Sequence, residues 1–274
     1  MIGVFDSGFG GLTILKAFLD KLPAYNYIYL GDSARAPYGN KSPELIYKYT
    51  EEAVDFLFKK GCELIIVACN TVSAEALRKI QQKWLPKNYL TGRVLGVIIP
   101  IAEAVVEEVK KSPKRNRVGI IGTRSTIESR AYNRELEKLS SGLEISSQAC
   151  PLFVPLIEEG WTARRETKMI LKYYLRPLKL KKIDCLVLGC THYSILFREI
   201  QKVMGKRCRV FDSPKFVVGK LEDYLRRHPE IEGKISKEKK RIFYTTDDTN
   251  RFKDLGEKFL GQKIEPIEKV SLQK

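Results

Sequence analysis

The feature of this sequence that most constrains its fold is a regular alternation of short apolar runs with longer amphipathic stretches. Runs such as "LIIVAC" (64–69) and "CLVLGC" (185–190) are apolar at nearly every position, which is typical of strands covered on both faces. The stretches between them have helical periodicity, as in 42–61, where Ser42 is placed to cap the first turn. Strands that alternate with helices of this length predict βαβ units and a mainly parallel α/β fold.

The apolar runs predict ten strands, and nine helical stretches lie between them. The predicted strands are 1–6, 25–31, 62–69, 93–98, 116–123, 143–150, 184–190, 207–212, 241–247 and 263–270. The predicted helices are 12–22, 42–61, 71–84, 100–112, 125–141, 151–175, 192–205, 213–228 and 248–261. Periodicity alone does not decide between a closed barrel and two open, doubly wound sheets.

Composition limits the classes of protein to consider. Of the 274 residues 43% are hydrophobic, yet no run approaches the roughly 18 apolar residues of a membrane span. The N-terminus lacks the pattern of a signal peptide, so we expect a cytoplasmic protein with no membrane partner. The formal net charge of +16 is compatible with nucleic-acid binding. We favour a lysine-rich surface, with no nucleic acid required, because the basic stretches are not interleaved with aromatic residues.

The cysteines give little support to a disulfide framework or a metal site. All six lie in a chain with no C-x-x-C motif and only two histidines, so we expect free thiols and no metal. Four of them are interpreted as buried, structural thiols: Cys62, Cys150, Cys185 and Cys208.

A glycine-rich loop, "FDSGFGG" (5–11), directly follows the first predicted strand. In open α/β sheets ligands bind beyond the carboxyl ends of the strands, and glycines there allow the backbone to approach a ligand closely. Asp6 ends that strand as a candidate base or ammonium partner. The loop lacks the last glycine of G-x-G-x-x-G and the lysine of a P-loop, which disfavours a nucleotide site.

Cys69 and Cys190 are each the last residue of a predicted strand and enter a helix. A helix N-terminus favours the thiolate, and Thr71 and Thr191 are placed to cap these helices or bind a carboxylate. Two thiols on opposite walls of a site suit the removal of a proton from one face of a carbon and its return to the other. A thiol hydrolase with Cys190 as nucleophile and His192 as base remains an alternative.

Four blocks, "IGVFDSGFGGLTIL", "GDSARAPYG", "VACNTVSA" and "LGCTHYSIL", together resemble glutamate racemases of the cofactor-independent aspartate/glutamate racemase superfamily. The resemblance implies two similar, doubly wound, mainly parallel-sheet domains that face each other across an active-site cleft. They would comprise residues 1–95 plus 207–274, and residues 96–206. It also implies L- and D-glutamate as substrates, no cofactor, a homodimer, and a supply of D-glutamate for peptidoglycan. Aspartate racemase or another cofactor-independent amino-acid racemase is the nearest alternative.

By resemblance, Cys69 and Cys190 are the two acid/bases, the first acting on the D-enantiomer and the second on the L-enantiomer. Asp6 would assist the first cysteine and His192 the second, with Glu159 as a further assisting carboxylate. The residues that match substrate-binding positions are Asp6, Ser7, Tyr38, Gly39, Asn70, Thr71, Thr191 and His192. The sequence departs from the usual family pattern at Ile99 and at Ser194 and Ile195.

Overall fold

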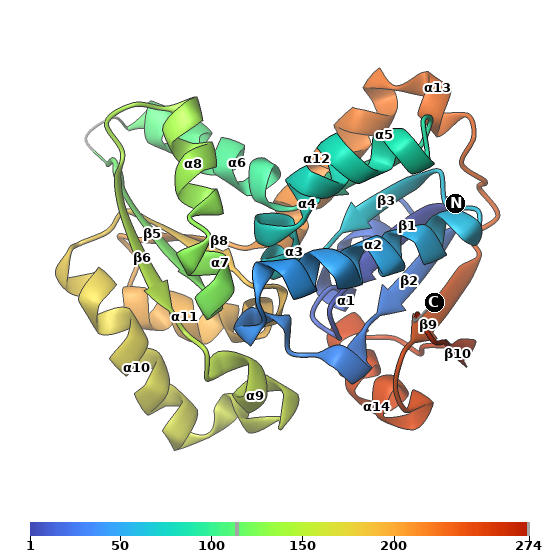
Figure 1. The fold of residues 1–274 in the computed structure, drawn as a ribbon. Helices are drawn as coiled ribbons and strands as arrows, with labels where there is room; N and C mark the ends of the chain where they lie inside the picture. The colour runs from blue at the N-terminus through green and yellow to red at the C-terminus, as the bar shows by residue number, and fades with distance from the viewer. Residues whose placement is uncertain (113–114, 273–274) are drawn as a thin grey trace.

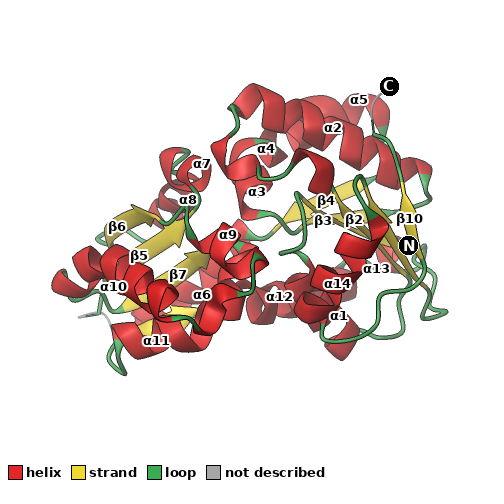
Figure 2. Ribbon diagram, turned by 90° about the horizontal axis from the view of Figure 1, so that it is seen from below, coloured by secondary structure: helices red, strands yellow, loops and turns green. Residues whose placement is uncertain are grey.

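The computed structural model describes residues 1–112 and 115–272, which form two parallel β-sheets with helices on both faces (Figures 1 and 2). The larger sheet has the order β10-β9-β2-β1-β3-β4 and the smaller one β6-β5-β7-β8, and every strand pair is parallel. The predicted fold class, two mainly parallel α/β units, is confirmed, and a single closed barrel is excluded.

All ten predicted strands are present among the described residues. They are β1 (Ile2–Asp6), β2 (Tyr27–Gly31), β3 (Leu64–Val67), β4 (Arg93–Gly96), β5 (Arg117–Gly122), β6 (Glu144–Ala149), β7 (Cys185–Gly189), β8 (Arg209–Phe211), β9 (Arg241–Thr245) and β10 (Ile267–Lys269). The central strands β1, β2, β3 and β7 are buried at every position, as the unbroken apolar runs predicted.

The helices follow the predicted stretches, with some broken into shorter pieces. They are α1 (Leu12–Lys21), α2 (Pro43–Lys59), α3 (Asn70–Glu75), α4 (Leu77–Lys79), α5 (Leu85–Asn88), α6 (Ile98–Lys111), α7 (Arg124–Glu128), α8 (Ala131–Leu139), α9 (Phe153–Glu158), α10 (Arg165–Leu180), α11 (Phe197–Met204), α12 (Ser213–Arg227), α13 (Pro229–Glu232) and α14 (Thr249–Leu260). Ser42 caps α2 as predicted, accepting a hydrogen bond from the backbone N–H of Leu45.

The helices cover the two sheets from opposite sides. Figure 2 shows α2, α4 and α5 above the larger sheet, with α1, α12, α13 and α14 below it. The smaller sheet is packed between α6 and α8 on one face and α10 and α11 on the other. Helix α12 contacts both α1 and α6, so it joins the layers of the two units.

The predicted boundary at residues 206/207 requires a correction. Strand β8 pairs with β7, with Cys185 opposite Arg209 and Val187 opposite Phe211, so the smaller sheet extends past residue 206. The chain rejoins the larger sheet only at β9, which pairs with β2. An apolar run predicts that a strand exists, but its sheet is decided by tertiary pairing.

The predicted helical stretches 71–84, 125–141, 151–175 and 192–205 are each broken into shorter pieces, two of them for clear local reasons. The stretch 125–141 is divided into α7 and α8 at Arg130, whose φ of 53° is left-handed. The stretch after Cys190 begins as a 3₁₀ turn, Thr191–Leu196, before α11 starts. Among the described residues, no helix has the length and apolar character needed to cross a bilayer.

Candidate active site

A cavity of about 520 Å³ lies where the carboxyl ends of strands from both sheets converge. Its walls are the loops that follow β1, β2, β3 and β9 of the larger sheet and β5, β6 and β7 of the smaller one. Cys69 lines it from the larger-sheet unit and Cys190 from the smaller-sheet unit. The ligand position expected for open α/β sheets therefore coincides with the position of the two predicted thiols.

The thiol of Cys69 lies in a buried polar corner. Its Sγ is 3.3 Å from the Ser7 hydroxyl, and Asp6 is close enough for its charge to raise the pKa of the thiol. Asp6 is 1% exposed and accepts hydrogen bonds from the backbone N–H of Gly8, at 2.9 Å, and from the Thr191 hydroxyl, at 3.5 Å. Asp6 does not line the cavity but lies behind it, where it connects Cys69 to the opposite loop.

Cys190 is flanked by an imidazole and a carboxylate. Its Sγ is 4.0 Å from His192 Nδ1, and His192 Nε2 is 2.9 Å from Glu158 Oε1. Glu158 lines the cavity, whereas Glu159 is exposed and does not. Glu158, at the end of α9, therefore faces the cavity and the imidazole, whereas the predicted Glu159 faces away from both.

Burial dominates the acidity of the groups at the centre of the site. Desolvation raises the pKa of Cys69 to about 11, and the pKa of Cys190 lies well above its ordinary value for the same reason. Charge on Cys69 raises the pKa of Cys190 further, which places the two thiols in one electrostatic environment. Burial also raises the pKa of Asp6, although His192 and the N–H groups of Gly8 and Gly11 oppose the rise. The thiolate-favouring effect expected of a helix start is therefore outweighed by desolvation.

Two glycines of the loop after β1 lie so close to neighbouring side chains that a Cβ would not fit. A Cβ on Gly10 would lie 2.2 Å from Thr191 Oγ1 and 2.5 Å from His192 Nδ1. A Cβ on Gly11 would lie 2.6 Å from Asp6 Cβ. Only glycine lets this loop approach the Cys190 loop so closely, so these residues help to fix the spacing between the two walls.

The first turn of α3, directly after Cys69, provides polar groups to the cavity lining. Asn70 accepts a hydrogen bond from the Tyr132 hydroxyl at 2.6 Å, but its buried Nδ2 has no partner. Thr71 Oγ1 lies 3.0 Å from Thr123 Oγ1 and 3.2 Å from Thr126 Oγ1. An unpaired buried amide is costly without a ligand, so Asn70 is a strong candidate to donate to a carboxylate.

Tyr38 and Gly39 line the cavity as predicted, but the Tyr38 hydroxyl is already engaged. It donates to Asp32, which also accepts from Arg35 Nε at 2.6 Å and from Thr246 Oγ1 at 2.8 Å. Gly39 packs against Thr123, with a Cβ at that position only 2.6 Å from Thr123 Cβ. This loop therefore contributes its backbone and ring, rather than a free hydroxyl, to the cavity wall.

Most predicted site residues line the cavity together, and several lining residues were not predicted. Ser7, Tyr38, Gly39, Cys69, Asn70, Thr71, Cys190, Thr191 and His192 all line it. The lining residues that sequence reasoning missed include Thr123, Arg124, Leu152, Glu158, Asp247 and Arg251. Thr123 and Asp247 follow the carboxyl ends of β5 and β9, so the strand-end rule could have identified them. Among residues 1–112 and 115–272, no group of three His, Cys, Asp or Glu side chains could hold a metal.

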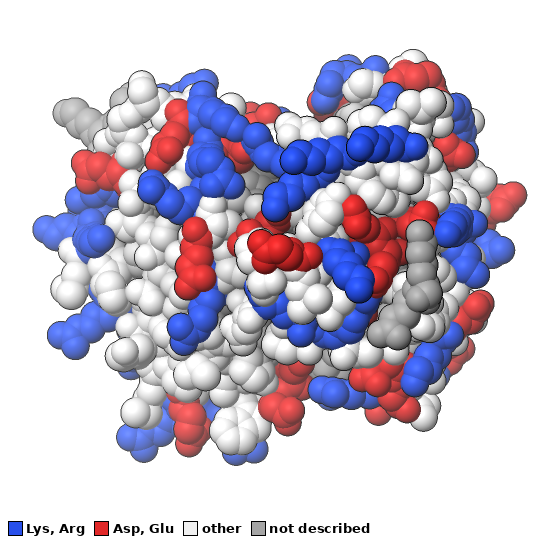
Figure 3. Space-filling model, viewed as in Figure 1, with Lys and Arg blue, Asp and Glu red and all other residues white. Residues whose placement is uncertain are grey.

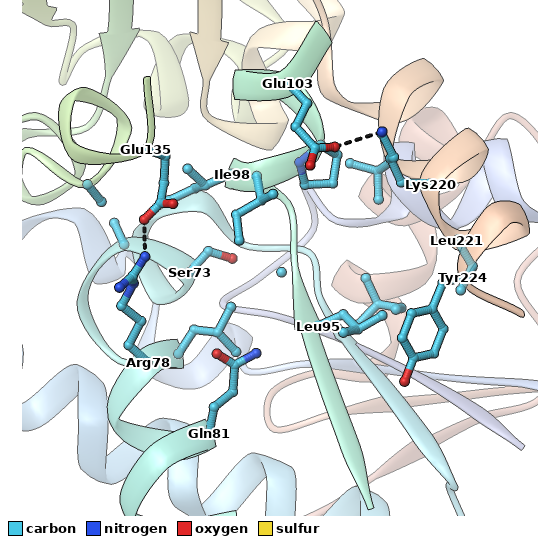
Figure 4. A pocket seen from close by; sticks show the side chains of 18 of the residues that line it. Ser73, Arg78, Gln81, Leu95, Ile98, Glu103, Glu135, Lys220, Leu221 and Tyr224 are labelled. Carbon is cyan, nitrogen blue, oxygen red and sulfur yellow. Dashed lines mark hydrogen bonds and ion pairs between the residues drawn. The ribbon is translucent and has the colours of Figure 1, made fainter. Parts of the chain in front are cut away.

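A second cavity, of about 320 Å³, lies between α4, α6, α8 and α12 and contains none of the predicted site residues (Figure 4). Ion pairs border it, Arg78 with Glu135, and Lys220 with Glu103 at 2.7 Å. Leu95, Ile98 and Leu221 contribute apolar surface (Figure 4). No cysteine of the described residues lines this cavity, whereas both Cys69 and Cys190 line the first one.

Comparisons with known proteins identify the family and the overall fold. A model of the Asp/Glu/Hydantoin racemase family matches residues 11–221. A glutamate racemase of Aquifex aeolicus is 42% identical over 266 residues, which cover 97% of this chain and 96% of that protein. The crystal structure of a glutamate racemase from Francisella tularensis in complex with D-glutamate is 35% identical, with a TM-score of 0.87, and the match covers 99% and 97% of the two chains. Glutamate racemase isoform RacE1 from Bacillus anthracis gives 33% identity and a TM-score of 0.89, with the same shares covered.

Proposed function

We propose that this chain, which belongs to the Asp/Glu/Hydantoin racemase family and is thus an isomerase, interconverts L- and D-glutamate by two-thiol proton transfer, as its similarity to glutamate racemases supports. The observation that carries the proposal is that Cys69 and Cys190 line one cavity from two different units of the fold. Two bases on opposite walls can address opposite faces of a tetrahedral carbon, which a single base cannot do without moving the substrate.

In the direction from D- to L-glutamate, the Cys69 thiolate removes the proton from Cα and becomes a thiol. The Cys190 thiol then donates its own proton to the opposite face of the planar carbanion and becomes a thiolate. The reverse reaction exchanges the two roles. Atoms and charge balance within the pair, because one thiol and one thiolate are present before and after each conversion.

The raised thiol pKa values suit this chemistry. The proton on Cα is very weakly acidic. The thiolate of Cys69, whose thiol has a pKa of about 11, is therefore a stronger and better-matched base than the thiolate of an exposed cysteine. The same burial keeps most of the two thiols protonated in the free protein. Neighbouring groups must therefore take up and return the thiol protons. We assign that task to Asp6 beside Cys69 and to the His192–Glu158 pair beside Cys190.

Substrate binding follows from the polar groups on the walls. Glutamate carries two carboxylates and one ammonium, and the free Nδ2 of Asn70 is a donor suited to a carboxylate. The hydroxyls of Ser7 and Thr71 in the cavity lining add further polar groups, while Asp6, behind the wall beside Thr191, contributes negative charge near the ammonium. Preorganised donors in a water-excluding cavity stabilise the carbanion that forms at Cα.

A cofactor-free racemisation assay tests the proposal. We expect the circular dichroism signal of either glutamate enantiomer to decay to zero with purified protein and no added cofactor, and aspartate to react far more slowly. Cys69→Ala and Cys190→Ala should each abolish racemisation, whereas Cys208→Ala, which removes a buried thiol outside the cavity, should not. Racemisation that survives either of the first two substitutions contradicts the two-thiol mechanism. A faster reaction with aspartate than with glutamate would show that the protein is an aspartate racemase.

A covalent acyl intermediate on Cys190 would show that the protein is a thiol hydrolase and not a racemase. Mass spectrometry of the protein under turnover should show no acyl adduct on Cys190, because proton transfer leaves no bond between sulfur and carbon.

We further propose that the enzyme is a cytoplasmic homodimer that supplies D-glutamate for peptidoglycan. A bacterial strain lacking its own racemase should then require external D-glutamate for growth unless this chain is expressed.

A further inference from the structure

Helix α10 displays a strip of apolar side chains to solvent. Met169, Tyr173 and Leu180 are 61%, 76% and 71% exposed. Their spacings of four and seven residues place them above one another on one side of the helix. The opposite side of α10 already fills the core, with Thr167, Leu171, Tyr174, Leu175 and Leu178 buried. The exposed strip is therefore not needed to hold the helix on the sheet.

A basic strip lies directly beside the apolar one. Lys168, Lys172, Arg176 and Lys179 recur at spacings of four, four and three, and they line a groove of about 450 Å³ between α10 and α11. Lys202 of α11 also lines this groove. Its only acidic lining residue is Glu199, which is paired with Lys202 at 2.8 Å.

The cations of this groove are available for an external anion. Among the described residues, Lys168, Lys172 and Arg176 form no ion pair. Figure 3 shows the surface over α10, at the lower left, as largely uncharged, with Lys and Arg and some acidic atoms at its border. Trp161, in the turn before α10, is 38% exposed and has the guanidinium of Arg164 4.5 Å from its ring centroid.

We propose that α10 docks the protein onto the surface of an anionic phospholipid bilayer. Phosphate and anionic headgroups would occupy the basic groove, and Met169, Tyr173 and Leu180 would enter the boundary between headgroups and acyl chains. The proposal concerns a reversible surface contact and departs from the expectation, drawn from the sequence, of no membrane partner. It is independent of the chemistry assigned to the two thiols.

Two other partners fit the same surface less well. A nucleic acid would be attracted by the cations, but the exposed aliphatic groups of Met169 and Leu180 offer its phosphates and bases nothing. A second copy of the chain packed strip to strip would bring two equally basic grooves together, at an electrostatic cost. An anionic bilayer offers headgroups that can pair with the basic strip and an acyl boundary that can bury the apolar strip.

Co-sedimentation with lipid vesicles tests the docking. The full-length protein is mixed with vesicles of equal parts phosphatidylglycerol and phosphatidylcholine, or of phosphatidylcholine alone, at about 0.1 M salt. We expect strong binding to the first and little to the second. Lys168→Glu/Lys172→Glu/Arg176→Glu should weaken binding at least tenfold. The matched triple variant Lys83→Glu/Lys87→Glu/Lys258→Glu, which changes the net charge equally on exposed residues elsewhere, should bind like the wild type.

The apolar strip is tested separately. Met169→Ser/Leu180→Ser should weaken vesicle binding severalfold, whereas Leu90→Ser, at a residue 84% exposed elsewhere, should not. All variants should retain wild-type racemisation, which shows that they are folded. Equal loss in the matched charge variant, or equal binding to both kinds of vesicle, overturns the proposal. Binding to a 30-base-pair DNA duplex with none to vesicles assigns the surface to nucleic acid. Self-association abolished by Met169→Ser/Leu180→Ser, without vesicle binding, assigns it to a second copy.

Discussion

Nε2 of His192 lies 2.9 Å from Oε1 of Glu158, while Nδ1 of the same ring lies 4.0 Å from the sulfur of Cys190. The imidazole thus bridges a carboxylate and a thiol, in the order carboxylate, imidazole, sulfur. A carboxylate at one ring nitrogen holds the imidazole in place and orients the other nitrogen towards sulfur. This relationship explains how a thiol buried beside an apolar strand end could exchange its proton.

The carboxylate can be tested against its neighbour in the sequence. Glu158→Gln should lower kcat at least tenfold in the direction that begins with Cys190, because it removes the charged partner that holds the imidazole beside the sulfur. Racemisation from each enantiomer measures the effect. Glu159→Gln is the matched control and should change either rate less than twofold, since Glu159 is exposed and outside the cavity. The reverse pattern would restore Glu159 as the assisting residue.

The spacing between the two walls depends on Gly10. Gly10→Ala should lower kcat by about a hundredfold, because the new Cβ would displace Thr191 and His192 from positions that it would approach within 2.2 Å and 2.5 Å. Gly219→Ala is the control, since a Cβ there meets nothing within 4 Å. Wild-type kcat in Gly10→Ala with an unchanged melting temperature would show that the loop spacing does not position the catalytic groups.

The buried charge of Asp6 should lower the free energy of unfolding, although Asp6 takes part in the proposed reaction. Burial raises its pKa, so the folded state disfavours the ionised form, and at neutral pH that charge reduces the free energy of unfolding. Asp6→Asn should therefore abolish or strongly reduce racemisation yet raise Tm. Calorimetry at pH 7 measures it. A lower Tm would mean that the hydrogen bonds of Asp6 outweigh the cost of burying its charge.

A structural thiol should make the protein sensitive to alkali. Burial raises the pKa of Cys62 from its ordinary value near 9 to about 12. The stability due to the protonated thiol is complete below pH 9 and is lost progressively as pH rises towards 12. The free energy of unfolding should fall between pH 8 and pH 10, and this fall should be about 1 kcal/mol smaller in Cys62→Ala. Denaturant titrations at the two pH values measure the difference, and identical falls would contradict the assignment.

Much of the fold and site was predictable because the relevant signals are local. Apolar runs such as Leu64–Val67 identify strands, and a cysteine at a strand end identifies the edge where ligands bind. The sheet to which Arg209–Phe211 belongs was not predictable, since it depends on pairing with a distant strand.

The details of the site depended on three-dimensional packing. Whether Glu158 or Glu159 faces the cavity is set by where the last turn of α9 ends, which neighbouring glutamates do not reveal. The direction of the thiol pKa shifts was also not predictable, because burial raised the pKa of Cys69 more than nearby N–H groups lowered it. Local sequence rules describe the helix start but not how deeply it is buried.

The measurement that tests the central claim most directly is deuterium incorporation at Cα during racemisation in deuterated water. L-glutamate that carries protium is converted to a few per cent, and both enantiomers are then separated and analysed by mass spectrometry. With Cys69 and Cys190 on opposite faces, the D-glutamate formed should carry solvent deuterium, while the remaining L-glutamate should carry almost none. D-glutamate that retains the original protium, or deuterium appearing equally early in both enantiomers, would show that one base serves both faces and would contradict the account.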